Sequence, residues 1–302
     1  MNTHLWKLGL MSVAVVVWAC NTDATGKSTN MIGSNGDREG PWRLWLTAPV
    51  DIVGDSTTGL NLAQVVDDSA DASYFVDVEY QNGQPEGKAV CRYRSGPPQA
   101  ELRFKDGQRN GIAFAWYESG SKQAEVNFVQ GRREGVATSW HVNGTKKSET
   151  RFVAGRKDGR EVDWYENGAK ETELVFVDGR EEGIMSAWYE NGAKKVRVIF
   201  KAGKVEGITR TWYQGGEKRD EALFTHGTMN GVQRSWFETG ARMEEIPCKD
   251  GKRDGIVRSW YENGARHEEV QYKAGRKDGV EKIWDRNGVL TQKIWANGRL
   301  GK

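Results

Sequence analysis

Aromatic positions recur along most of this chain at one fixed interval. A tryptophan stands at every twenty-fourth position of one column, which comprises Trp116, Trp140, Trp164, Trp188, Trp212, Trp236, Trp260 and Trp284. A second column with the same interval of 24 is phenylalanine from Phe104 to Phe224 and continues through Cys248 and Tyr272. A period that persists through so many copies indicates an array of repeats, rather than the two globular domains that 302 residues would ordinarily suggest.

Within each repeat, apolar and polar residues alternate with the period of a β-strand. The unit reads approximately G-I-x-x-x-W-Y-E-N-G-A-K-x-x-E-x-x-F-x-x-G-R-x-D/E. Ile184 and Trp188 lie four residues apart and therefore share one face of a strand, and Val198 and Phe200 share a face of the return strand. The Asn-Gly pair predicts a type I′ turn between these two strands. A second polar turn, bounded by glycines as in residues 155–159, predicts the connection to the next repeat.

We therefore predict an all-β fold, an elongated and twisted antiparallel β-meander built from 24-residue, two-stranded repeats in a single-layer sheet. No segment shows sustained helical periodicity. In such a sheet we expect tryptophan to lie beside tryptophan and phenylalanine beside phenylalanine in continuous ladders. We also expect the face that Trp188 shares with Ile184 to be the packed core.

The composition is consistent with this architecture. The chain has 37 glycines and 13 tryptophans, and three glycine columns that start at Gly83, Gly87 and Gly96 take 27 of those glycines. Forty-four Lys and Arg against 42 Asp and Glu leave a net charge of +2, which argues against a nucleic-acid partner.

Residues 1–19 have the pattern of a signal peptide. Lys7 precedes an apolar run from Leu8 to Ala19, which is too short for a membrane span of about 20 residues. The run ends in Val-Trp-Ala-Cys at positions 17–20, which resembles the lipobox of bacterial lipoproteins and implies that Cys20 is lipidated. Acylation with more than one chain would hold the protein stably on a membrane. The alternative is an ordinary cleaved signal followed by a chance cysteine, which would make the protein secreted.

We divide the chain into four segments on these grounds. They are a signal peptide at 1–19, a flexible tether at 20–40 after the lipidated cysteine, a divergent segment at 41–79 with features of a degenerate repeat, and the repeat array at 80–302.

Histidines and acidic residues offer no arrangement that predicts catalysis. His141, His226 and His267 occupy different columns of the repeat, and His4 belongs to the signal peptide, so we expect neither a metal site nor a catalytic dyad. We interpret one glutamate column as a solvated face of mixed charge rather than a glycosidase pair, because lysines such as Lys146, Lys170 and Lys194 face it. The column consists of Glu149, Glu173, Glu221, Glu245 and Glu269.

The remaining acidic cluster, Asp67, Asp68 and Asp71, matches no calcium-binding loop and is interpreted as a polar loop. We therefore expect no metal, no cofactor and no enzymatic activity.

Two cysteines remain after Cys20. Cys91 and Cys248 lie about 13 strands apart, or about 60 Å in an open sheet. A disulfide needs Cα atoms within about 7 Å, so an open array predicts two free thiols, whereas a closed or strongly curled array would allow a bond.

The aromatic columns also allow a binding role. Because tryptophan is expected in the core, the neighbouring tyrosines on the opposite face are the better candidates for ligand or partner contact. These are Tyr165, Tyr189, Tyr213 and Tyr261. A cell-wall glycan could stack on such a row.

The repeated W-Y-x-N-G unit, with its following glutamate and phenylalanine, resembles the bacterial variant of the MORN repeat, over roughly residues 80–301. This variant is found in YwqK-type antitoxins of toxin–antitoxin systems. The resemblance implies an elongated antiparallel sheet that contacts proteins or membranes. A lipobox differs from what a cytoplasmic antitoxin would carry.

Taken with the lipobox, the resemblance leads us to expect a lipid-anchored scaffold of the bacterial cell envelope, facing the periplasm or held in the outer membrane, that binds another protein. The alternatives are a module that binds carbohydrate or cell wall through the tyrosine rows, and an antitoxin that neutralises a partner toxin.

Overall fold

The computed structural model describes residues 36–52 and 72–301 in full, and the strand backbones at 21–22, 28–29, 31–32 and 65–66. The expected signal peptide, Cys20 and the three aspartates Asp67, Asp68 and Asp71 lie outside the described residues. All regular structure in the described part is β-strand. Among these residues no helix is long and apolar enough to cross a membrane.

The strands before the tryptophan column are β1 (Asn21–Thr22), β2 (Ser28–Thr29), β3 (Met31–Ile32), β4 (Arg38–Leu46), β5 (Val65–Val66), β6 (Tyr74–Gln81), β7 (Gln84–Tyr93), β8 (Pro98–Lys105) and β9 (Gln108–Arg109). The next group is β10 (Gly111–Trp116), β11 (Lys122–Val129), β12 (Arg132–Arg133), β13 (Gly135–Trp140), β14 (Lys146–Val153), β15 (Arg156–Trp164), β16 (Lys170–Val177), β17 (Arg180–Trp188), β18 (Lys194–Lys201) and β19 (Lys204–Val205). The last group is β20 (Gly207–Trp212), β21 (Lys218–Thr225), β22 (Thr228–Met229), β23 (Gly231–Trp236), β24 (Arg242–Lys249), β25 (Lys252–Arg253), β26 (Gly255–Trp260), β27 (Arg266–Lys273), β28 (Arg276–Trp284), β29 (Leu290–Ala296) and β30 (Arg299–Leu300).

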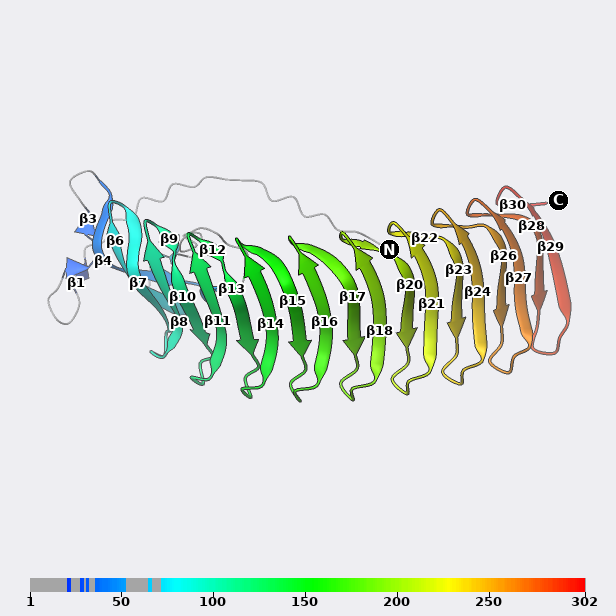
Figure 1. The fold of residues 1–302 in the computed structure, drawn as a ribbon, viewed down its shortest axis with the longest axis horizontal. Coiled ribbons are helices and arrows are strands. Elements are labelled where there is room, and N and C mark those ends of the chain that lie inside the picture. The colour runs from blue at the N-terminus through cyan, green and yellow to red at the C-terminus, as the bar shows by residue number, and fades with distance from the viewer. Residues whose placement is uncertain are drawn as a thin grey trace.

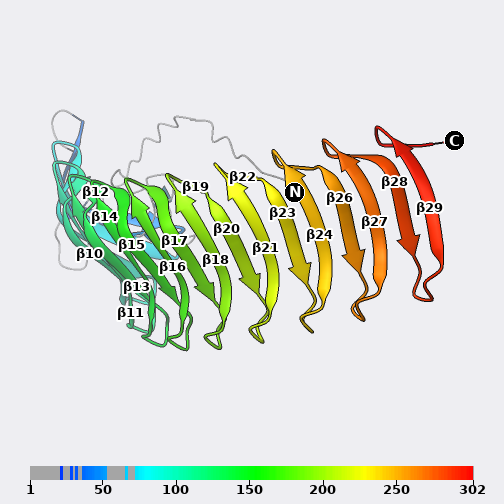
Figure 2. The ribbon, with the colours of Figure 1, turned by 45° about the vertical axis from the view of Figure 1, so that its right-hand side comes forward.

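Successive strands of the array pair antiparallel in one open sheet, whose strands stand side by side along the length of the molecule (Figure 1). The sheet is a single twisted layer, as the rotated view shows (Figure 2). The predicted elongated meander is therefore confirmed. β4, which precedes the repeats, pairs with β6 and joins the same sheet.

The two turns of each repeat have different geometries. Asp106 and Gly107 form a two-residue loop between the paired Lys105 and Gln108, and their φ angles of 51° and 74° are both positive, as a type I′ turn requires. Each such loop is held by a carboxylate or amide from the preceding repeat. For example, Glu134 Oε2 accepts a hydrogen bond of 2.8 Å from the backbone N–H of Ala154. This explains the acidic residue that closes the repeat motif.

The predicted type I′ turn at Asn-Gly is wrong. Gly168 has a φ of 81° but Asn167 keeps a negative φ, and the Gly168 N–H donates to the Tyr165 carbonyl at 2.9 Å. Tyr165 N–H in turn donates to the Ala169 carbonyl at 2.9 Å, and the strand register shifts just before, between Asp163 and Trp164. This is a three-residue loop with a type I turn and a glycine bulge, in which only the last residue needs positive φ.

The core lies on the face opposite the tryptophans, which corrects the predicted tryptophan core. Met185 pairs with Val198 on the face that carries Phe200, whereas Ile184 pairs with Ile199 on the face that carries Trp188. Ile184 is 48% exposed. The buried phenylalanines are Phe104, Phe128, Phe152 and Phe176. We call the phenylalanine side the inner face and the tryptophan side the outer face.

The expected ladders of touching rings do not form among the described residues. Equivalent rings lie two strands apart, about 10 Å, which exceeds the 4.5–7 Å of an aromatic pair. Cations fill the gaps instead: Lys122 Nζ lies 4.8 Å from the Trp140 ring centre on the outer face. On the inner face the Arg133 guanidinium lies 4.0 Å from the centre of the Phe152 ring. Cation–ring contacts of this kind recur along each face, although the inner column is interrupted where Glu181, Val205 and Met229 replace the cation.

Burial is deepest near the N-terminal end of the array. Residues 47–52 leave β4 and cross the inner face; we call this segment the strap. Its Val50 and Ile52 are 7% and 1% exposed and belong to the same buried cluster as Leu102 and Phe128. The strap therefore adds a second layer over the first strands of an otherwise single-layered sheet.

The two thiols are free, as the open array predicted. Cys91 is fully buried beneath the strap, and this burial raises the pKa of its thiol to about 11. Cys248 is half-buried in the phenylalanine column.

We expect iodoacetamide to alkylate Cys248 at least about 100-fold faster than Cys91 in the folded protein at about pH 8.5, because Cys91 is both inaccessible and protonated. Mass spectrometry of timed digests measures the two rates. In urea the two cysteines should react alike, and equal rates in the folded protein would contradict the buried position of Cys91.

Candidate functional site

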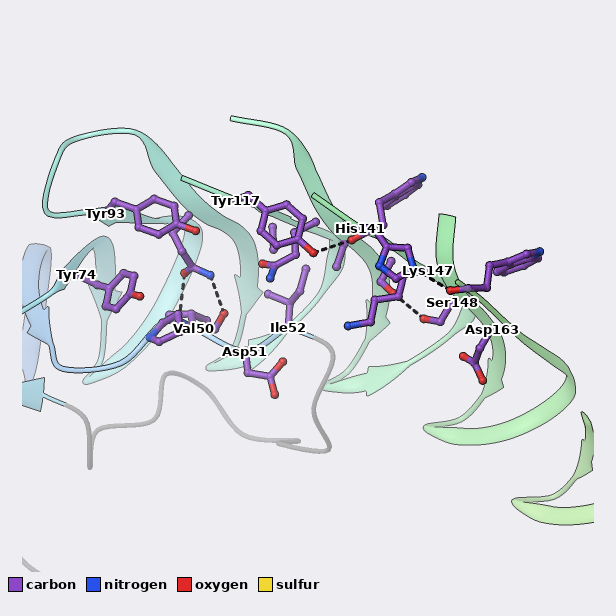
Figure 3. A pocket seen from close by; sticks show the side chains of 18 of the residues that line it. Val50, Asp51, Ile52, Tyr74, Tyr93, Tyr117, His141, Lys147, Ser148 and Asp163 are labelled. Carbon is purple, nitrogen blue, oxygen red and sulfur yellow. Dashed lines mark hydrogen bonds between the residues drawn. The ribbon is translucent and has the colours of Figure 1, made fainter. Parts of the chain in front are cut away.

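The inner face holds the strap through its backbone. The Gln99 side-chain amide makes two hydrogen bonds to Val50, accepting from its N–H at 3.1 Å and donating to its carbonyl at 3.3 Å (Figure 3). The Arg109 guanidinium, itself 3% exposed, donates to the Asp51 carbonyl at 3.3 Å. Val50 and Ile52 point into the core, so alternate side chains of the strap are buried. The strap backbone is held by hydrogen bonds from side chains of the sheet.

A cavity of about 680 Å³ begins beside the strap and continues along the inner face over the next repeats (Figure 3). This volume is within the range of about 300–1,000 Å³ that ligand sites occupy. Four small side chains line it, namely Ala115, Ala124, Ser139 and Ser148. Later repeats carry larger residues in the column of Ala124, such as Val196, Asp220 and Glu244. The space therefore exists because the repeats next to the strap have small residues on the inner face.

Aromatic and polar groups surround this space. Tyr117 and His141 stand along one side, and Lys147 and Asp163 lie on the next strands (Figure 3). Gln123 also lines the cavity, and it occupies the position of Gln99 one repeat later. The site thus offers hydrogen-bond donors, acceptors and charges of both signs around a small apolar base.

The tyrosine column has a structural role that the sequence analysis did not foresee. Each predicted contact tyrosine donates its hydroxyl to the backbone carbonyl of the tryptophan in the following repeat. The acceptors are Trp188 for Tyr165 at 2.9 Å, Trp212 for Tyr189 at 2.8 Å, Trp236 for Tyr213 at 2.8 Å and Trp284 for Tyr261 at 2.9 Å. Burial raises the pKa of the Tyr165 hydroxyl, so it remains a donor. The column therefore links successive repeats by hydrogen bonds at one edge of the sheet.

These four tyrosines and the cavity are distinct parts of the face. The tyrosines that line the cavity are Tyr74, Tyr93 and Tyr117, from earlier repeats. Gln99, Gln123 and the strap were not singled out from the sequence. The interval of 24 between Gln99 and Gln123 is visible there, but the role of the position becomes clear only when the strap is seen bound to Gln99.

Removing one tyrosine hydroxyl tests how much these hydrogen bonds between repeats contribute to stability. Tyr189→Phe should lower the free energy of unfolding by about 0.5–1.5 kcal/mol, because it removes one hydrogen bond and keeps the ring. Phe237 occupies the same column, so the fold accepts this side chain. Tyr189→Ala should cost more, since the ring beneath Lys195 is lost as well. Urea titration followed by tryptophan fluorescence measures both, and an unchanged midpoint for Tyr189→Phe would show that the hydroxyl contributes nothing.

The glutamate column lies on the outer face and is ion-paired. Glu173 contacts Lys170 at 2.6 Å and Arg160 at 2.5 Å, and Glu221 contacts Arg210 at 2.7 Å. Hydrogen bonds from these cations hold the pKa of both carboxyls below the usual range. Glu149, Glu245 and Glu269 have the equivalent partners Lys146, Arg242 and Arg266. Carboxylates and cations therefore alternate with the tryptophans across this face.

The described histidines are separate and structural. His141 Nε2 lies 2.8 Å from the Trp164 carbonyl and thus takes the place of a tyrosine hydroxyl. His226 sits in a turn with a φ of 52°, and His267 contacts Ser259 at 3.1 Å. The described residues contain no group of three or more side chains that could hold a metal ion.

Known families provide one comparison. A family model described as the MORN repeat variant matches residues 253–274, which run from the end of β25 through β27 to the next turn. A search of curated proteins found no match. The matched stretch covers most of one 24-residue unit, and the same strand pairing and turns recur along the array. Residues 253–274 are therefore similar to the MORN repeat variant.

Proposed function

We propose that this protein is a non-enzymatic scaffold, anchored to the bacterial cell envelope through a lipidated Cys20, and that its repeat sheet binds another protein. The observation that carries the proposal is the open sheet. Beyond the strap, no other described element covers either face of the array (Figures 1 and 2). Solenoid-like arrays commonly use such extended surfaces to bind partners.

The polar side chains of the array favour binding over catalysis. Tyrosine hydroxyls and the acidic turn residues are engaged in hydrogen bonds between repeats, and the outer-face carboxylates are paired with cations. A general acid or base needs a side chain that can exchange a proton with a substrate. The side chains that repeat most regularly are committed to building the sheet.

Site-specific photo-crosslinking in intact cells tests the scaffold. A benzophenone amino acid at Lys147 on the inner face or at Ile184 on the outer face should capture one recurrent protein, because a partner bound to that face places its C–H groups next to the photoactivated ketone. Val289, in a turn near the C-terminal end and 62% exposed, is the matched control. Absence of any crosslinked protein from both faces would overturn the scaffold role.

The anchor is tested separately. Radiolabelled palmitate should label the wild-type protein and not Cys20→Ala, and the variant should move from the membrane to the soluble fraction. Unchanged fractionation of the variant would exclude the anchor and leave a secreted scaffold.

The resemblance to YwqK-type repeats makes a toxin one candidate partner. Co-expression with the product of a neighbouring gene that is toxic on its own should restore growth only if the two proteins bind. Growth that remains inhibited would remove the antitoxin role without affecting the scaffold.

A further inference from the structure

The strap shows what the inner face can bind. It lies extended across the sheet, with the buried side chains of Val50 and Ile52 two residues apart. Its backbone N–H and carbonyl at Val50 are both satisfied by one side-chain amide, that of Gln99. An amide that donates and accepts in this way recognises a peptide group whatever the side chain of that residue is.

The same amide is repeated where no segment of the strap reaches it. Gln123 stands 24 positions after Gln99, which places it two strands further along the sheet, about 10 Å away. Gln123 lines the cavity, and its side chain has no hydrogen-bond partner among the described residues. A half-buried amide with both functions unused is suited to the role that Gln99 performs.

The base of the cavity has small residues at the positions equivalent to those beneath the strap. Val50 rests over Cys91, whose thiol contacts the Val50 backbone. In the next repeat the equivalent of Cys91 is Ala115, and its neighbour is the buried Ala124. Small residues at these positions leave room for apolar side chains of the size that the strap inserts.

We propose that the cavity is a binding site for an extended peptide segment of a partner protein, and that the Gln123 amide holds the peptide backbone as Gln99 holds the strap. The partner segment carries β-branched apolar residues at alternate positions, like Val-Asp-Ile in the strap. It lies along the inner face beyond Ile52, over Ala115 and Ala124. This inference rests on the proposed scaffold function and names the site and the kind of segment bound.

Fluorescence polarisation with a synthetic peptide tests this site. The probe is fluorescein-labelled Ala-Pro-Val-Asp-Ile-Val, the sequence of residues 48–53, and the protein is the full chain. Gln123→Ala should weaken binding about tenfold, because it removes two hydrogen bonds to the peptide. Gln123→Glu should weaken it as well, since a carboxylate cannot donate to a carbonyl. Glu171 in the same column shows that the fold accepts glutamate there.

Two controls separate this site from other causes. Gln233→Ala removes a half-buried glutamine from a distant repeat of the inner face and should leave the affinity unchanged. A probe N-methylated at its first valine, the one that corresponds to Val50, should bind about as weakly to the wild type as the unmodified probe binds to Gln123→Ala. Circular dichroism and the unfolding midpoint confirm that each variant is folded.

Three results would overturn the inference. Binding that is lost in Gln99→Ala but kept in Gln123→Ala would mean that the probe displaces the strap. Equal losses in Gln123→Ala and Gln233→Ala would mean non-specific binding. No binding to the wild type, with Gln123→Ala lowering its stability, would mean that the chain itself fills the cavity. If crosslinks from the outer face persist in any of these cases, the scaffold stands and only this site is lost.

Discussion

Phe128→Ala should lower the free energy of unfolding by about 3–5 kcal/mol, the largest loss we expect from a single substitution in this chain. Phe128 is 2% exposed and belongs to the cluster that the strap covers. Its ring also lies beneath the Arg109 guanidinium, whose carbon is 5.3 Å from the ring centre. Removing the ring leaves a cavity in the only two-layered part of the described sheet and takes away the surface on which a buried cation rests.

The neighbouring residue supplies the control. Val129 follows Phe128 in β11 but points to the opposite side and is 47% exposed, so Val129→Ala should cost less than about 1 kcal/mol. Urea titration gives the overall change, and hydrogen exchange in β10–β13 shows whether the loss is local. Similar losses for the two variants would contradict the assignment of the core to the phenylalanine face.

Gly255→Ala should destabilise the array by about 2–4 kcal/mol through backbone strain and a close contact. Gly255 has a φ of 117°, and a Cβ at this position would lie 3.0 Å from Cγ of Pro247 on the paired strand β24. The proline ring cannot rotate away, because it is closed onto its own backbone. The strand pairing of β23, β24 and β26 must therefore shift to accommodate the methyl group.

Gly264→Ala is the matched control. Gly264 has a φ of 83° in the next turn, and nothing lies within 4 Å of its added Cβ, so only the conformational cost of about 1 kcal/mol applies. Hydrogen exchange of the β24 and β26 amides should increase in Gly255→Ala and change little in Gly264→Ala. If the two variants were equally stable, the contact with Pro247 would not limit this position.

Most of the fold could be predicted from the sequence because the period of 24 is a property of the chain itself. A recurring Asn-Gly or x-Gly pair shows where the chain reverses, and strict alternation shows that the segments between are strands. The separation of Cys91 and Cys248 followed from the same count, and both thiols are free.

The choice of the buried face could not be predicted in the same way. Ile184 and Trp188 are the largest apolar residues of their strand, yet their face is the outer one. Burial is decided by what lies across from a strand. On the inner face Ala187 and Met185 are opposite Val196 and Val198, and these small and medium residues close against one another. The outer tryptophans are instead covered by lysine and arginine stems, which keep their charged ends in water.

The candidate site could not be predicted from the sequence for a related reason. Gln123 is an ordinary polar residue in an ordinary column until the strap, about 50 residues away in sequence from Gln99, is seen bound to the equivalent position. The tyrosine hydroxyls, likewise, looked available for a ligand until the neighbouring repeat placed a carbonyl 2.8 Å from Tyr189.

The repeat, its two strands and the positions of its turns follow from the order of the amino acids, because they depend on residues within one 24-residue unit. The folded array was needed to show which face is buried, which turn is type I′, what the tyrosines bond to and where a cavity remains. The tyrosine bonds and the buried face depend on how neighbouring repeats pack, and the cavity depends also on the fold-back of residues 47–52, which precede the repeats.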